Sequence, residues 1–249
     1  MGGNDPGVGI PSVMISQADG ENIITSLQSS ININGTLQNS GTVQPDGDFD
    51  NGIIAHEYGH GISTRLTGGA SNSNCLNNAE QMGEGWSDWF ALMLTIETND
   101  QGGDIRGIGT YAINEPITGN GIRPTPYSTD LAINPSTYAT TNLATISQPH
   151  GIGYVWCTML WDLSWALIDT YGYDADLYDG SGGNNIAMNL VIEALKLQVC
   201  NPGFVDGRDA ILQADQLLYG GSNKCLIWQV FADRGLGYSA NQGLSLIHI

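Results

Sequence analysis

The sequence predicts a mainly α-helical protein with a small α/β piece at its N-terminus, and three observations support this fold class. Apolar residues recur at helical spacing in six segments that follow residue 50. Short apolar runs of strand length are found in the first 35 residues. Apolar side chains form 41% of the 249 residues, which is enough for a buried core and argues against a disordered chain.

The N-terminal piece, residues 1–35, is expected to combine strands with one helix. Its predicted elements are a strand over 10–15, a helix capped by Asp19 that ends at Leu27, and a strand over 31–33. Residues 36–50 are polar and rich in Gly and Asp, so we expect them to form a linker.

Six helices are predicted after the linker. The first begins at Asn51 and stops at Gly68-Gly69, and the others cover 80–97, 151–169, 185–199, 207–218 and 223–234. Residues 98–149 have no clear periodicity and are rich in Gly, Pro, Asn and Thr. Such a long irregular stretch is unusual in a compact domain unless it is functional.

The charge balance excludes several classes of partner. With 7 basic and 25 acidic side chains the net charge is −18, so neither nucleic acid nor an anionic membrane surface is expected to bind. No run of 18 apolar residues is present, so we predict no membrane span. A lysine-poor, acid-rich composition suits an exported protein.

Both ends of the chain look cut. The start has no basic segment followed by an apolar one, so no signal peptide is expected there. Residues 244–249 (LSLIHI) follow no capping logic and resemble the read-through of a sequencing-library adapter. We expect a non-native tail, and the alternative is a short apolar C-terminal strand.

The strongest motif is His56-Glu57-Tyr58-Gly59-His60, an H-E-x-x-H pattern inside the first predicted helix. Positions i and i+4 share a helix face, so both imidazoles can reach one metal ion, and Glu57 lies beside them. Two histidines and a carboxylate suit a zinc ion that keeps one position open for catalysis.

The third metal ligand is expected from the next helix. Glu84 and Asp88 lie four residues apart, so Glu84 can ligate while Asp88 hydrogen-bonds a ligand imidazole. Glu80, one turn earlier, is the rival ligand. His150 stands at the start of a later helix and is the remaining histidine outside the suspected tail.

Several separated motifs resemble the fungalysin family of secreted zinc metalloendopeptidases. They begin at His56, Met82, His150, Cys200 and Arg208, and residues 46–51 precede the first of them. The resemblance covers about 46–240 and implies the helical C-terminal half of a thermolysin-like (gluzincin) fold. The segment 10–20 resembles the tail of a protease-associated domain, which bacterial members can carry before the metal helix.

The implied domains are a protease-associated remnant over 1–35, a linker over 36–50, a partial catalytic domain over 51–243 and the tail over 244–249. Implied roles are one zinc ion per chain on His56, His60 and Glu84, with Glu57 as general base and His150 stabilising the oxyanion. Tyr127 is a candidate second oxyanion donor, against a plain loop aromatic.

The resemblance implies a secreted enzyme that hydrolyses peptide bonds in proteins or peptides, made as a precursor with an inhibitory propeptide. The alternatives are a catalytically inactive zinc-binding fragment or pseudoenzyme, and an exopeptidase on the same zinc site. The β-rich subdomain that supplies the substrate-binding edge strand in this family has no counterpart in these residues.

Two lesser signals concern cysteines and calcium. Four cysteines allow three pairings, and we favour a Cys200–Cys225 disulfide with Cys157 as a buried thiol. Asp174, Asp176 and Asp179 precede a Gly-rich segment, which is a calcium-loop composition without EF-hand spacing. A solvated loop is the favoured alternative to a Ca²⁺ site.

Overall fold

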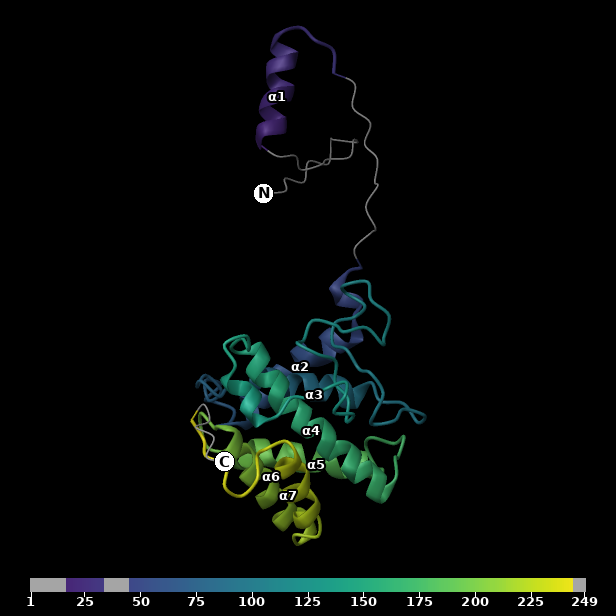
Figure 1. Cartoon of the computed structure of the whole chain (residues 1–249), viewed down its shortest axis with the longest axis vertical. Coiled ribbons are helices and arrows are strands. Elements are labelled where there is room, and N and C mark those ends of the chain that lie inside the picture. The colour runs from purple at the N-terminus through teal and green to yellow at the C-terminus, as the bar shows by residue number, and fades with distance from the viewer. Residues whose placement is uncertain (1–16, 34–44, 244–249) are drawn as a thin grey trace. The chain divides into compact units, whose positions relative to one another are not determined.

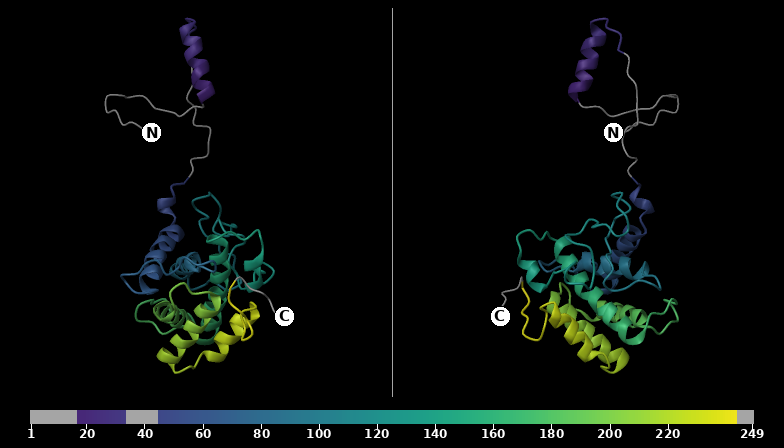
Figure 2. Two further views of the ribbon diagram at one scale, coloured as in Figure 1. Left: turned by 90° about the vertical axis from the view of Figure 1, so that its left-hand side faces the viewer. Right: turned by 45° about the vertical axis from the view of Figure 1, so that its right-hand side comes forward.

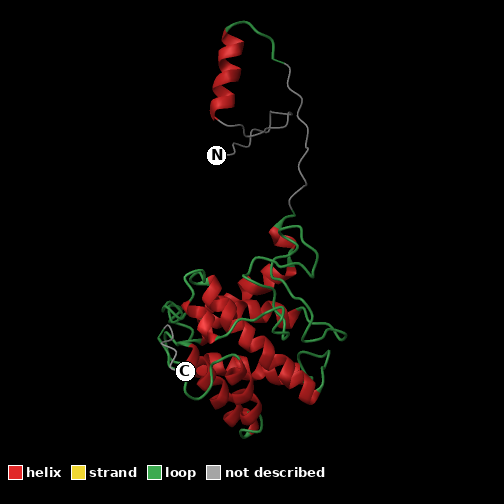
Figure 3. Ribbon diagram, in the orientation of Figure 1, coloured by secondary structure: helices red, strands yellow, loops and turns green. Residues whose placement is uncertain are grey.

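A computed structural model describes residues 17–33 and 45–243 of the chain. The chain divides into two compact units, Met1–Val43 and Gln44–Ile249, which are described separately below. The strand expected over 10–15 and the tail at 244–249 lie outside the described residues, as does most of the linker. Helices dominate the described parts, which confirms the predicted fold class (Figure 3).

In the described residues of the first unit, 17–33, there is one helix, α1 (Gln17–Gln28), close to the bounds predicted for it. None of its residues is buried, and the side chains of Ile24 and Leu27 are more than half exposed. The strand predicted over 31–33 is wrong, because these residues have no regular structure. A strand needs a partner for its backbone hydrogen bonds, and the described residues offer it none.

The second unit contains the six helices that were predicted, with ends shifted by up to three residues. They are α2 (Asn51–Leu66), α3 (Gly83–Leu94), α4 (His150–Tyr171), α5 (Gly183–Leu197), α6 (Phe204–Tyr219) and α7 (Lys224–Asp233). Two short 3₁₀ helices, η1 (Gly47–Phe49) and η2 (Tyr138–Asn142), lie in the connections. In the described ranges, β structure is limited to one isolated antiparallel bridge between Arg106 and Tyr127.

Helix α4 is the central element of this unit. It packs against α3, α5 and α7, and most of its length is buried (Figure 1, Figure 2). Trp156 lies at the middle of the core, with its ring 5.0 Å from that of Trp86 on α3 and 5.8 Å from that of Phe231 on α7. Burial of large aromatic rings from three helices therefore fixes α4 in place.

Two close helix crossings bring α2, α3 and α4 together. A Cβ atom at Gly59 of α2 would lie 2.8 Å from Ser87 Cα of α3, so only glycine permits this approach. Likewise, a Cβ atom at Gly85 of α3 would lie only 2.2 Å from the carbonyl oxygen of Gly153 on α4. These glycines let three backbones meet beside the residues of the predicted metal site.

The disulfide joins Cys75 to Cys200, so the expected Cys200–Cys225 pairing is wrong. Backbone contacts explain the difference, because Asn201 N–H donates to the Cys75 carbonyl oxygen and the segments after α2 and α5 run together. Cys225 lies exposed in the first turn of α7, and Cys157 is a buried thiol as predicted. Among the described residues, no helix is both long enough and apolar enough to cross a membrane.

Candidate metal centre

Helix α2 carries both histidines of the H-E-x-x-H motif on one face. Asp50 caps its N-terminus, accepting hydrogen bonds from the backbone N–H groups of Gly52 (2.9 Å) and Ile53 (3.2 Å). The rings of His56 and His60 meet edge to face with centroids 4.7 Å apart, as expected for side chains one helical turn apart. The helix therefore presents two imidazoles to the same point.

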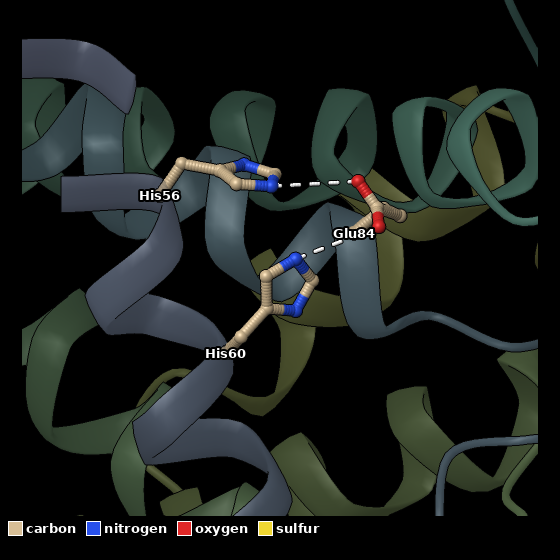
Figure 4. Close-up of side chains that lie close together, drawn as sticks. All are labelled: His56, His60 and Glu84. Atoms are coloured by element: carbon tan, nitrogen blue, oxygen red, sulfur yellow. Dashed lines mark ion pairs between the residues drawn. The ribbon is translucent and has the colours of Figure 1, made fainter. Parts of the chain in front are cut away.

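Glu84, in the first turn of α3, completes the group. Its Oε2 lies 3.4 Å from His56 Nε2, and its Oε1 lies 3.5 Å from His60 Nε2 (Figure 4). One ligand atom from each of the three residues lies within 4.8 Å of the other two. Among the described residues, His56, His60 and Glu84 are the His, Cys, Asp or Glu side chains that come together closely enough to hold a metal ion. The side chains point toward one another from two packed helices (Figure 4).

The donor set and its spacing fit zinc. Two ligands held tetrahedrally at about 2.0–2.2 Å from zinc lie about 3.3–3.5 Å apart. The histidine–glutamate distances of 3.4 and 3.5 Å match that separation. Burial alone lowers the pKa of His56. Hydrogen bonds to Asp88 and Glu84 outweigh this effect and raise the pKa of His56 to about 9. The same carboxylates that favour a proton here favour a metal cation.

Asp88 lies behind His56 and is fully buried. Its Oδ1 lies 2.7 Å from His56 Nδ1, so the ring donates its Nδ1 proton to the carboxylate, and Nε2 is the nitrogen that would give up its proton to bind a metal. Burial by itself raises the pKa of Asp88, but hydrogen bonds to His56 and Arg123 outweigh it and lower that pKa. The carboxylate is therefore ionised and orients the ring.

The structure also locates the two residues expected to handle protons and the oxyanion. Glu57 is exposed on α2, between the two histidines in sequence. His150 is the first residue of α4, and its Nε2 lies 3.6 Å from Glu84 Oε2. With 59% of its side chain exposed, His150 lies beside the histidine–glutamate group and remains accessible to solvent.

Glu80, the rival ligand, has a different role. Its buried carboxylate accepts hydrogen bonds from Tyr138 Oη (3.0 Å) and from the backbone N–H groups of Phe204 (3.0 Å) and Gly243 (2.6 Å). Phe204 begins α6, so Glu80 satisfies a free N–H group at that helix terminus. Its carboxylate belongs to the core, and Glu84 provides the carboxylate of the metal group.

Tyr127 does not fit the role of an exposed oxyanion donor. Its hydroxyl group is fully buried and donates to Asp88 Oδ2 at 2.6 Å. Burial is the main cause that raises the pKa of Tyr127 well above its usual value, with the negative charge of Asp88 adding to it. The alternative prediction, a loop aromatic without a catalytic role, agrees better with this position. Tyr127 nevertheless contacts the site, because its hydroxyl group binds Asp88, the carboxylate that orients His56.

Sequence reasoning missed Arg123, which is buried and donates to both Asp88 and Glu84. It lies in the irregular segment, where no periodicity places a side chain. The small number of basic residues is the one signal in the sequence that points to Arg123. A chain with seven basic residues and a net charge of −18 has few side chains that could neutralise a buried carboxylate.

The acidic loop after α4 gains no support as a calcium site. Asp174 Oδ2 accepts from Ser181 N–H, and Asp176 Oδ1 accepts from the N–H groups of Tyr178 and Asp179. These carboxylates hold the turn that leads into α5. The expectation of Ca²⁺ therefore stays a prediction.

A helical body in which an H-E-x-x-H helix meets a glutamate from the next helix is the arrangement of a metallopeptidase domain. The family model described as fungalysin metallopeptidase (M36) matches residues 17–240, and the chain belongs to this family. The match begins within the segment assigned above to a protease-associated remnant, and that domain assignment stays a prediction.

The chain is similar to fungal proteins named extracellular metalloproteinases. It is 47% identical over 213 residues to extracellular metalloproteinase MEP of Pyricularia oryzae, covering 82% of this chain and 33% of that protein. It is 48% identical over 203 residues to the protein of the same name from Neosartorya fischeri, covering 78% and 31%. The chain thus spans about a third of the length of these curated relatives.

Proposed function

We propose that the protein to which this chain belongs is a secreted zinc metalloendopeptidase that hydrolyses peptide bonds in proteins. The observation that carries the proposal is the convergence of His56, His60 and Glu84 at distances suited to one zinc ion. Membership of the fungalysin family and relatives named extracellular metalloproteinases support both the activity and the extracellular location.

The proposed chemistry divides among five residues of this chain. A zinc ion held by His56, His60 and Glu84 would supply a Lewis acid that lowers the pKa of water to about 7 and polarises a carbonyl oxygen. Glu57 accepts a proton from the water that attacks the scissile carbonyl and passes it to the departing amine. His150 donates a hydrogen bond to the oxyanion.

The exposed positions of Glu57 and His150 support these roles, since both must reach a substrate. Substrates are proteins or peptides in this proposal, and an inhibitory propeptide is the partner expected in the precursor. The acidic charge of −18 supports the absence of nucleic acid and of anionic membranes from the list of partners.

The decisive experiment uses the full-length protein with Glu57→Gln. We expect kcat for a protein substrate to fall about 10²–10⁴-fold, because the general base is lost. Zinc content should stay at one ion per chain, since Glu57 is not among the ligands. Glu97→Gln, an exposed glutamate beyond the end of α3, is the matched control and should keep full activity. Unchanged turnover in Glu57→Gln would exclude the mechanism.

The two alternatives give different results. A pseudoenzyme would bind zinc and fold but hydrolyse nothing at full length. A strict exopeptidase would release residues from chain ends only, so mapping the products of a folded protein substrate by mass spectrometry separates it from an endopeptidase. Products from internal bonds are the result that we expect.

A further inference from the structure

We propose that Arg123 is a positioning residue that sets the geometry of the metal ligands by holding Glu84 and Asp88 together. This inference rests on the proposed zinc site and extends it to the long irregular segment between α3 and α4. It gives a function to one buried arginine of a chain that has few basic residues.

The contacts of Arg123 define the role. Its Nε donates to Asp88 Oδ2 at 2.6 Å, and its Nη2 donates to Asp88 Oδ1 at 2.8 Å. The same Nη2 lies 3.2 Å from Glu84 Oε2. A single planar guanidinium group therefore binds the carboxylate that orients His56 and the carboxylate that ligates the metal.

The two carboxylates need such a partner because they lie one turn apart on the same face of α3. Like charges at this spacing repel, and Asp88 is fully buried, so an unpaired arrangement would be costly. Arg123 neutralises both and fixes the rotamer of each. The distance between Glu84 and the histidines of α2 depends on that rotamer.

The loop that carries Arg123 is anchored at both ends of α3. Arg106 N–H donates to the Tyr127 carbonyl oxygen at 3.0 Å, and Tyr127 N–H donates back to Arg106 at 2.8 Å. The Arg106 side chain binds Asp100 at 2.7 Å and Thr95 Oγ1 at 2.7 Å, near the C-terminus of α3. Arg123 makes the equivalent attachment at the N-terminal end, where the metal ligands lie.

Arg106 is therefore a matched control. Both arginines are buried to the same degree, belong to one loop and pair with carboxylates, but only Arg123 contacts the metal ligands. Loss of either should loosen the loop to a similar extent. Only loss of Arg123 should alter how the chain binds zinc.

The sign of the effect separates positioning from simple electrostatics. Removing a positive charge beside a divalent cation strengthens binding if charge is the whole effect. Removing a group that holds the ligands in place weakens binding, by about 10–100-fold for partners of this kind. The two explanations thus predict opposite changes in zinc affinity.

The experiment measures the zinc dissociation constant of Arg123→Met, Arg123→Lys and Arg106→Met by competition with a chromophoric chelator. We expect about 10–100-fold weaker binding for Arg123→Met. Arg123→Lys keeps the charge but cannot bridge two carboxylates, so it should also weaken binding. Arg106→Met should stay within about twofold of wild type. The visible spectrum of the Co²⁺-loaded chain should change in both Arg123 variants and not in Arg106→Met.

Unchanged or tighter binding in a folded Arg123→Met variant overturns the inference, and so does equal weakening in Arg106→Met. Tryptophan fluorescence establishes folding, and if Arg123→Met does not fold, Arg123→Lys decides on the same criteria. If the folded wild type binds no zinc, the proposed function is overturned as well. If the wild type binds zinc and the affinity is unchanged in the Arg123 variants, this inference alone is overturned.

Discussion

Four of the five arginines are buried, and each is placed against carboxylates or backbone carbonyl groups. Arg234, only 1% exposed, binds Asp162 and donates to the carbonyl oxygens of Asn134 and Ser136. Arg208 donates to the carbonyl oxygens of Leu236 and Gly237. At the scale of single residues, long polar side chains therefore hold irregular segments that have few hydrogen bonds of their own.

Glu80 offers a residue-scale prediction that separates it from Glu84. Glu80→Ala should lower the free energy of unfolding by about 2–4 kcal/mol, because three donors lose their acceptor and two of them, on Tyr138 and Phe204, belong to buried residues. Zinc stoichiometry should stay at one ion. Urea unfolding and metal analysis provide the two readings, with Glu84→Ala as the comparison that loses zinc. Loss of zinc from a folded Glu80→Ala variant would contradict the assignment.

Prediction from sequence worked for residues within one helix and failed for those in loops. The spacing of His56 with His60 and of Glu84 with Asp88 follows from 3.6 residues per turn. Arg123 and Tyr127 contact Asp88 from more than 30 residues away, through a loop with no period. Their positions depend on tertiary packing, which a linear pattern does not encode.

At the scale of elements, the position of Glu84 depends on how closely α3 and α4 approach. A Cβ atom at Gly153 would lie 2.5 Å from Glu84 Cβ and 2.5 Å from the backbone nitrogen of Gly85. Helices α3 and α4 can approach this closely only because Gly85 and Gly153 lack side chains. Glu84, the proposed metal ligand, therefore lies directly at a helix crossing.

Gly153→Ala should force that crossing apart. We expect a loss of about 1–3 kcal/mol in the free energy of unfolding, as in other overpacked cores, together with weaker zinc binding as Glu84 shifts. Gly61→Ala on α2 is the matched control, because a Cβ atom there meets nothing within 4 Å. It should instead stabilise the helix by about 0.5–1 kcal/mol. Denaturant titration with and without zinc measures both effects.

The helices themselves were predictable, but their contacts were not. Apolar periodicity placed all six helices of the second unit within a few residues of their ends. The strand predicted over 31–33 was wrong because short apolar runs do not reveal whether a partner strand exists. The glycines at the helix crossings do not recur at regular spacing either. The role of Gly85 and Gly153 is visible only in the packed structure, where the two helix backbones approach each other.

At the scale of the whole molecule, the disulfide connects segments that are 125 residues apart in sequence. Sequence reasoning favoured Cys225 as the partner of Cys200 because it lies closer in the chain. Cys75 is the true partner, since the segments that follow α2 and α5 run together. The bond closes a loop that includes α3, α4 and α5.

Replacing Cys75 and Cys200 by Ala should lower the free energy of unfolding by about 2–5 kcal/mol, because the unfolded chain gains freedom when so long a loop opens. Cys225→Ala removes an exposed thiol and should change stability by less than about 0.5 kcal/mol. Guanidinium unfolding of the three proteins compares them directly. A larger effect from Cys225 than from the pair would show that the connectivity is different.

The burial of Arg106, Arg123, Arg208 and Arg234 has a consequence for how a trypsin-like protease acts on the chain. A trypsin-like protease cleaves after lysine or arginine and must first pull some residues of an accessible, extended chain into its cleft. Outside the four buried positions, the basic side chains are Arg65, Lys196 and Lys224, and all three lie within helices. All three side chains are exposed, so their protection in the folded second unit comes from the helical backbone, and the rate of tryptic digestion measures how often these helices unwind.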